Sequence, residues 1–167
     1  MTLTTPRCLI LACGNTLRSD DGVGLWLACW AEERFHAQAG VRVIARQQWT
    51  PELTEDLAHS QFVLFIDCSL DSEPGSVKLS PVEPAAGHQA LATHHQGAAE
   101  LLALTLKLYN SLPSNAQLLT IGAGSTELGE KFSDAVTAAL PSACKLLEET
   151  VMCFLSGPKL PEMPRRA

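Results

Sequence analysis

Short apolar runs and longer amphipathic segments alternate along the chain. The short runs consist mostly of branched or aromatic residues, which is typical of buried strands. They predict strands at Cys8 to Cys13, Val41 to Ala45, Gln61 to Asp67 and Gln117 to Ile121, with a possible short edge strand at Ser76 to Leu79. The longer segments repeat apolar positions every three or four residues, and they predict helices over 21–37, 51–59 and 97–109 and a last helix from Ser133 onwards.

The alternation of strands with helices indicates the fold class. It predicts an α/β fold: a three-layer sandwich with a mainly parallel twisted sheet of about five strands and helices on both faces. The early half of the helix over 21–37, VGLWLACW, is apolar nearly all round, so we expect it to be deeply buried. Pro141 is expected to kink the last helix or to begin it afresh.

Length and charge bound the class of protein. The 167 residues suffice for one well-buried core but not for two ordinary domains. We predict one domain over 1–155 and a flexible Pro-rich tail over 156–167. Twelve basic against eighteen acidic residues give a net charge of -6, which argues against a nucleic-acid partner. No apolar stretch reaches membrane-spanning length and no signal-peptide pattern is present, so we expect no membrane partner and a cytoplasmic location.

Cysteine and glycine spacing argue against several kinds of site. The six cysteines contain no C-x-x-C pair, so zinc-ribbon and disulfide-framework interpretations fail. Gly14, Gly22 and Gly24 do not form the spaced pattern of a phosphate loop, and we expect no nucleotide cofactor. No serine or cysteine lies on a G-x-S-x-G elbow, which leaves nucleophilic catalysis poorly supported.

The stretch LILACGNTLRSDDGVG, at 9–24, is the most informative part of the chain. It predicts a buried strand, a tight loop, and two carboxylates where the loop meets a helix. For Asp20 the favoured interpretation is structural, because an aspartate at an N-cap accepts hydrogen bonds from free helix amides. Asp21 has a weaker structural role, since an acid in the first turn interacts favourably with the helix dipole but is partly redundant beside a cap.

Three chemically suitable side chains converge in this topology. Asp21 follows the first strand, Asp67 ends the third, and His94 precedes the helix over 97–109. Two carboxylates and an imidazole at one edge of a parallel sheet form a site able to hold a divalent metal, with nickel, zinc, iron and manganese all chemically possible. Structural alternatives stay open: Asp67 could cap the next turn, and His94 or His95 could be a polar helix entry, with at most one of them pointing into the crevice.

The segment from Cys68 to Ala92 is rich in Pro, Gly, Ser and Glu. A stretch of this length with so little regular pattern is often functional in a compact domain. We interpret it as a mobile rim beside the site.

At these residues the chain resembles the hydrogenase maturation proteases, endopeptidases that trim the C-terminus of the large subunit of nickel-iron hydrogenases. Four stretches carry the resemblance: Gly14-Asn15-Thr16-Leu17-Arg18-Ser19-Asp20-Asp21-Gly22-Val23-Gly24, then Phe65-Ile66-Asp67, then Thr93-His94 with Glu100-Leu101-Leu102, and last an L-G-x-x-x-S-x-x-V-x-x-A-L pattern from Leu128 to Leu140. The resemblance spans nearly the whole chain except the tail. It departs at Ala12, where the family usually has glycine.

The resemblance implies a function. The family's metal-binding and catalytic trio falls on Asp21, Asp67 and His94. The implied activity is removal of the C-terminal extension of a nickel-iron hydrogenase large-subunit precursor, after nickel insertion and through recognition of nickel carried by that substrate. Two hypotheses stay open for the cleavage. Either the metal polarises the carbonyl or activates a water, with Asp21 or Asp67 taking a proton, or a carboxylate activates water unaided.

Two other classes of function remain. One is a non-cleaving, metal-sensing hydrogenase-assembly chaperone that uses the same crevice. The other is a metal-dependent hydrolase of small molecules, which the long rim segment disfavours because such a rim suits a peptide better.

Overall fold

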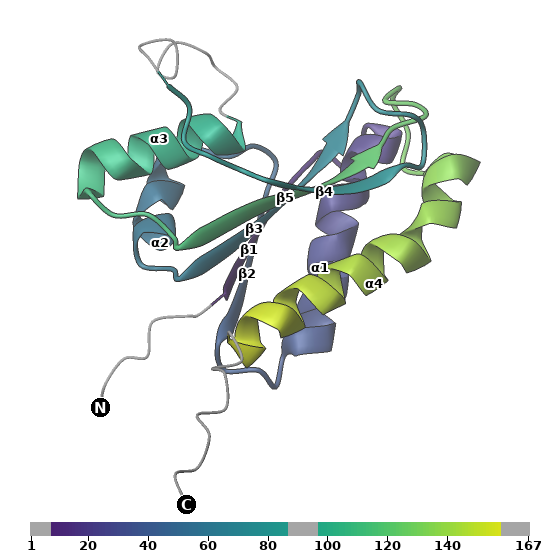
Figure 1. Cartoon of the computed structure of the whole chain (residues 1–167). Coiled ribbons are helices and arrows are strands. Elements are labelled where there is room, and N and C mark those ends of the chain that lie inside the picture. The colour runs from purple at the N-terminus through teal and green to yellow at the C-terminus, as the bar shows by residue number, and fades with distance from the viewer. Residues whose placement is uncertain (1–7, 87–96, 158–167) are drawn as a thin grey trace, which may run out of the picture.

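A computed structural model describes residues 8–86 and 97–157 of the chain (Figure 1). Its sheet has five strands in the order β2-β1-β3-β5-β4. The strands are β1 (Cys8–Cys13), β2 (Val41–Arg46), β3 (Phe62–Ser69), β4 (Val77–Pro81) and β5 (Asn115–Gly122). The strands β2, β1, β3 and β5 run parallel, and β4 pairs antiparallel with β5 at the edge. This is the mainly parallel sheet that the sequence predicts.

Helices cover both faces of the sheet (Figure 1). One face carries α1 (Val23–Phe35) and α4 (Asp134–Ser156), and the other carries α2 (Thr54–Ala58) and α3 (Ala98–Tyr109). Two short 3-10 helices, η1 (Ser19–Gly22) and η2 (Pro51–Leu53), precede α1 and α2. The predicted three-layer α/β sandwich is confirmed.

The strand β1 lies between the two halves of the core. All six of its residues are buried, and successive side chains point to opposite faces of the sheet. Ile10 packs with α1 and α4 residues such as Leu27 and Leu147, whereas Leu11 packs with Leu57 and Leu101 from α2 and α3. This double burial explains why β1 is an unbroken apolar run.

The helices α1 and α4 differ in detail from the sequence predictions. The helix α1 begins at Val23 because the acidic pair lies in η1, and its early half is only partly buried, with Trp26 40% exposed. An α-helix against a sheet buries one face, whatever the composition of the other. In α3 the buried residues include Leu101, Leu102 and Thr105, whereas Leu108 is exposed. The helix α4 continues through Pro141, so of the two outcomes predicted there the new start is not seen, and the kink stays a prediction.

The predicted domain boundary at residue 155 lies at the end of α4, which extends to Ser156. The residues 158–167 of the predicted tail are outside the described part of the chain, so the tail stays a prediction. None of the helices that the structure describes is long and apolar enough to cross a membrane.

Candidate active site

A pocket of about 450 Å³ lies where β1, β2 and β3 end. In an open parallel sheet, ligands bind in the crevice beyond the carboxyl ends of the strands. The pocket is lined by Cys13, Gly14, Asn15, Arg18, Asp21, Gln47, Gln48, Trp49, Asp67, Leu70 and Gly97. Two of the three predicted site residues, Asp21 and Asp67, therefore share one pocket.

The Asp21 side chain is held in place by the loop that precedes it. Its Oδ2 accepts a hydrogen bond from the backbone amide of Asn15 at 3.0 Å. The loop passes so close to η1 that a Cβ on Gly14 would lie 2.1 Å from the Asp21 carbonyl oxygen, and Gly14 has a φ of +155°. Only glycine fits there without distortion, so the Gly14-Asn15 turn fixes where Asp21 stands.

Asp67 is half-buried near the end of β3. The strand continues two residues beyond the predicted end, because Cys68 and Ser69 pair with Ile121 and Gly122 of β5. The Asp67 Oδ1 accepts from the Cys68 amide at 2.7 Å. The predicted alternative, a cap for the next turn, is not seen, since the bond is made within the strand.

Burial raises the pKa of the Asp67 carboxyl above its usual range. Hydrogen bonds from the Cys13 thiol and the Cys68 amide lower the pKa, but by less than burial raises it, and the nearby charge of Asp21 raises it further. A carboxylate with a raised pKa accepts a proton more readily near neutral pH than an exposed one does. Asp67 is therefore a stronger base than an exposed aspartate.

The third predicted residue, His94, lies outside the described residues, together with Thr93 and His95. Gly97, the residue that precedes α3, lines the pocket. Within 8–86 and 97–157, no group of three or more His, Cys, Asp or Glu side chains is arranged to hold a metal. The complete trio thus stays a prediction, with two members brought together.

Asp20 does not cap α1, contrary to the favoured interpretation of the sequence. The cap position of α1 is Gly22, which has no side chain to accept a bond. Asp20 is instead fully buried, and its carboxylate accepts bonds from the amides of Gly124, Ser125 and Ser133 and from the Ser133 hydroxyl, at 2.7 to 2.9 Å. The pKa of Asp20 is lowered, because burial, which alone would raise the pKa, is outweighed by these four bonds.

Backbone bonds extend this link between the first loop and the loop after β5. The amide of Ser19 donates to the Gly129 carbonyl at 2.7 Å, and the amide of Gly129 donates to the Leu17 carbonyl at 2.9 Å. The amide of Asp20 donates to the Ser125 carbonyl at 3.1 Å. The acidic pair is thus divided: Asp20 joins two loops, and Asp21 faces the pocket.

Residues 47–49 were missed by the sequence reasoning. Gln47, Gln48 and Trp49 follow β2 directly and line the same pocket. Because β2 is parallel to β1, its end meets the same edge of the sheet, and this was the signal that could have identified them.

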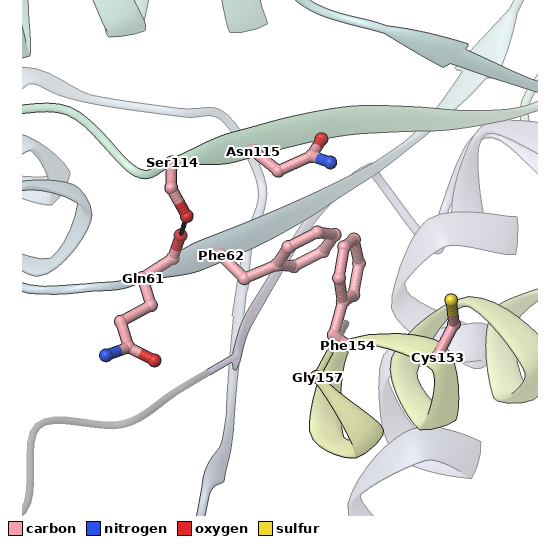
Figure 2. Close-up of a pocket in the computed structure, with 7 residues that line it drawn as sticks. All are labelled: Gln61, Phe62, Ser114, Asn115, Cys153, Phe154 and Gly157. Atoms are coloured by element: carbon pink, nitrogen blue, oxygen red, sulfur yellow. Dashed lines mark hydrogen bonds between the residues drawn. The ribbon is translucent and has the colours of Figure 1, made fainter. Parts of the chain in front are cut away.

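A second pocket, of about 460 Å³, lies at the opposite end of the sheet (Figure 2). Figure 2 shows Phe62 of β3 beside Phe154 of α4, and a hydrogen bond between Ser114 and Gln61. In that bond the Ser114 hydroxyl donates to the Gln61 carbonyl oxygen at 2.8 Å. The described residues that line this second pocket include no carboxylate and no histidine. It therefore lacks the chemistry predicted for the site.

Solved structures of hydrogenase maturation proteases are similar to this structure. The hydrogenase maturating endopeptidase HybD from E. coli has a TM-score of 0.71 and 20% identity, covering 90% of this chain and 94% of that chain. The hydrogenase 2 maturation peptidase from a Thaumarchaeota archaeon has a TM-score of 0.61 and 25% identity, covering 87% and 98%. The maturation protease HycI from Thermococcus kodakarensis has a TM-score of 0.63 and 22% identity, covering 90% and 96%.

No protein-family model and no curated protein matches this chain. The regions that match the solved structures nevertheless include nearly all of this chain and nearly all of each solved chain, so the similarity extends over whole molecules. The resemblance carried by the four sequence stretches is confirmed: the chain has the fold of the hydrogenase maturation proteases.

Proposed function

We propose that this protein is an endopeptidase that removes the C-terminal extension of a nickel-iron hydrogenase large-subunit precursor after nickel insertion. The observation that carries the proposal is the shared pocket of Asp21 and Asp67, at the ligand-binding edge of a sheet with the fold of maturation proteases. Nickel belongs to the substrate in this account. Asp21, Asp67 and His94 would contact it when the precursor docks.

The oxygen and nitrogen donors of the proposed trio are compatible with this role. Carboxylates and an imidazole bind nickel among other divalent ions, and three protein ligands leave coordination positions for the precursor's own ligands. Asp21 receives only one hydrogen bond, from the Asn15 amide, among the described residues. Its carboxylate therefore keeps acceptor capacity that faces the pocket.

The cleavage step needs a group that takes a proton from water. Asp67 suits this step because burial raises its pKa, which brings a carboxylate closer to the operating range of a general base. A metal beside it would polarise the scissile carbonyl or the water. Both hypotheses for the cleavage require Asp67 or Asp21 to be ionised before the step and protonated after it.

The alternative is a metal-sensing assembly chaperone that binds the precursor through the same pocket and does not cut it. The presence of both carboxylates favours the protease, since a protein that only binds could lose the residue that takes the proton. Binding followed by release of an intact precursor would favour the chaperone.

Cleavage by single variants tests the proposal. Wild-type protein and the Asp21→Asn, Asp67→Asn and His94→Ala variants are incubated with nickel-loaded precursor, and C-terminal processing is followed by electrophoretic mobility. We expect processing by the wild type and a loss of at least about 100-fold in each variant. Asp71→Asn is the matched control, because Asp71 is an exposed carboxylate shortly after Asp67 and does not line the pocket. Normal processing by Asp21→Asn or Asp67→Asn would contradict the proposal.

A further inference from the structure

Three leucines are exposed in loops at the edge of the sheet that carries the pocket. They are Leu17, Leu70 and Leu128, and among the described residues no other large apolar side chain outside the helices is exposed. Leu17 follows β1, Leu70 follows β3 and Leu128 follows β5. Because these three strands are parallel, their carboxyl ends share one edge, and the leucines gather there.

Leu17 and Leu128 lie on neighbouring segments that hydrogen bonds hold together. The Gly129 amide donates to the Leu17 carbonyl at 2.9 Å, and the Ser19 amide donates to the Gly129 carbonyl at 2.7 Å. On the other side of Leu128, the Ser19 hydroxyl donates to the Glu127 carbonyl at 2.8 Å. The backbone is therefore held on both sides of Leu128, yet the Leu128 side chain is 89% exposed and that of Leu17 is 56% exposed.

Folding does not explain this pair of side chains. A single exposed leucine is ordinary on a protein surface, but two neighbouring ones that join a pocket are typical of a binding surface. The buried Asp20 carboxylate adds four hydrogen bonds that hold the same two loops together. Apolar side chains on a surface that is already ordered lose little conformational freedom on binding, so this arrangement favours association with a partner.

The position beside the pocket indicates which partner this is. Asn15 and Arg18, before and after Leu17 in the chain, line the pocket, and so does Leu70. A pocket of about 450 Å³ has the size of a small-molecule site, so a folded protein substrate can insert only a short segment into it. The rest of that substrate must lie over the surface beside the pocket, where Leu17 and Leu128 are exposed.

We propose that Leu17 and Leu128 form a docking surface for an apolar patch on the folded part of the precursor, whose C-terminal segment enters the pocket. The inference rests on the proposed function and adds to it the chemistry by which the precursor is held. Because this contact forms on binding and is kept in the transition state, its loss raises KM and leaves kcat nearly unchanged.

Single replacements by serine test the docking surface. Leu17→Ser and Leu128→Ser are compared with the wild type, with nickel-loaded precursor as the substrate. Burial of a leucine side chain against a partner is worth at least about tenfold in affinity, so we expect KM to rise about tenfold and kcat to change less than twofold. The melting temperature should stay at the wild-type value, because both side chains are exposed in the free protein.

The matched control is Leu108→Ser, the same chemical change at a leucine that is 59% exposed. Leu108 lies near the far end of α3, whose first end is at the pocket, and it does not line the pocket. This variant should leave both KM and kcat at their wild-type values.

Four outcomes would overturn the inference. A wild-type KM for both variants, in a protein that cleaves the precursor, would remove the docking surface and leave the proposed function intact. A raised KM together with a lower melting temperature would make the leucines structural. A dimer in analytical ultracentrifugation that both variants convert to monomers with a wild-type KM would assign the surface to a second copy of this chain. Failure of the wild type to cleave any nickel-loaded precursor would remove the proposed function and this inference with it.

Discussion

Asp20 and Ser133 are joined by two hydrogen bonds across more than a hundred residues of sequence. The Asp20 carboxylate accepts from the Ser133 amide at 2.7 Å and from its hydroxyl at 2.8 Å. The same hydroxyl accepts from the Val136 amide at 3.3 Å, as the N-cap of α4. One buried carboxylate therefore holds the start of α4 against the loop that presents Asp21.

Replacing this carboxylate should destabilise the protein. Asp20→Ala leaves the amides of Gly124, Ser125 and Ser133 without their acceptor in a buried site. Hydrogen bonds to a charged acceptor are worth more than neutral ones, so we expect a loss of about 3 kcal/mol in the free energy of unfolding. Urea denaturation followed by circular dichroism measures it.

The matched control is Asp134→Asn, in the exposed first turn of α4. Only a helix-dipole interaction of about 0.5 kcal/mol is removed there. Equal unfolding free energies for Asp20→Ala and the wild type would show that the four bonds do not hold the loops together.

Stability should fall in acid partly through Asp20. The pKa of Asp20 is lower in the folded state than in the unfolded state, so its contribution is present above the unfolded pKa of about 4 and is lost as pH falls through the folded pKa. The stability gap between wild type and Asp20→Asn should therefore be widest at neutral pH and should close below about pH 4. A gap that stays constant from neutral to acid pH would argue against an ionised Asp20.

The contribution of Asp67 to stability should depend on pH in the opposite direction. The pKa of Asp67 is higher in the folded state than in the unfolded state, so protonation of Asp67 favours the fold. The stability that the protonated carboxyl contributes is fully present below the unfolded pKa. It is lost as the pH rises through the folded pKa. Asp67→Asn, which resembles the protonated form, should be more stable than the wild type at pH 7 while it loses processing. Thermal unfolding at pH 7 and at acid pH measures the difference, which should vanish in acid. If Asp67→Asn were less stable than the wild type at pH 7, this would contradict the conclusion that burial destabilises the ionised Asp67 carboxylate.

The Gly14 turn should tolerate no side chain. In Gly14→Ala the new Cβ would meet the Asp21 carbonyl at 2.1 Å, at a backbone φ that alanine rarely adopts. We expect a loss of about 2 kcal/mol and reduced processing, because relief of the clash displaces Asp21. The control is Gly97→Ala, where the Cβ meets only the end of the Glu100 side chain, which can move. Equal stability of the two variants would contradict this account.

The fold was predictable because its signals are local. Residues 62–66 are all buried in β3, and this apolar run needs no knowledge of distant residues to be identified as a buried strand. Asp21 and Asp67 could be paired from the sequence as well, since parallel strands end at a common edge. The extension of β3 to Ser69 could not be predicted, because it depends on pairing with β5.

The environments of Asp20 and Trp49 could not be predicted from the sequence, and the physical reason is the same for both. A local rule assigns Asp20 to the nearest helix as a cap, but its partners lie at 124, 125 and 133, and only the folded chain brings them close. Trp49 follows a strand and packs in the core, as an apolar residue should. That its Nε1 lacks a hydrogen-bond partner among the described residues depends on all of its neighbours together.

The most direct test of the account is intact-mass analysis of two forms of one hydrogenase large-subunit precursor, nickel-loaded and nickel-free, after incubation with this protein. The account predicts loss of a C-terminal peptide from the loaded form alone, because Asp21 and Asp67 meet the metal only when the precursor carries it. Loss of the same peptide from both forms would contradict recognition of the metal. An unchanged mass for both forms of the precursor would contradict the proposed protease activity.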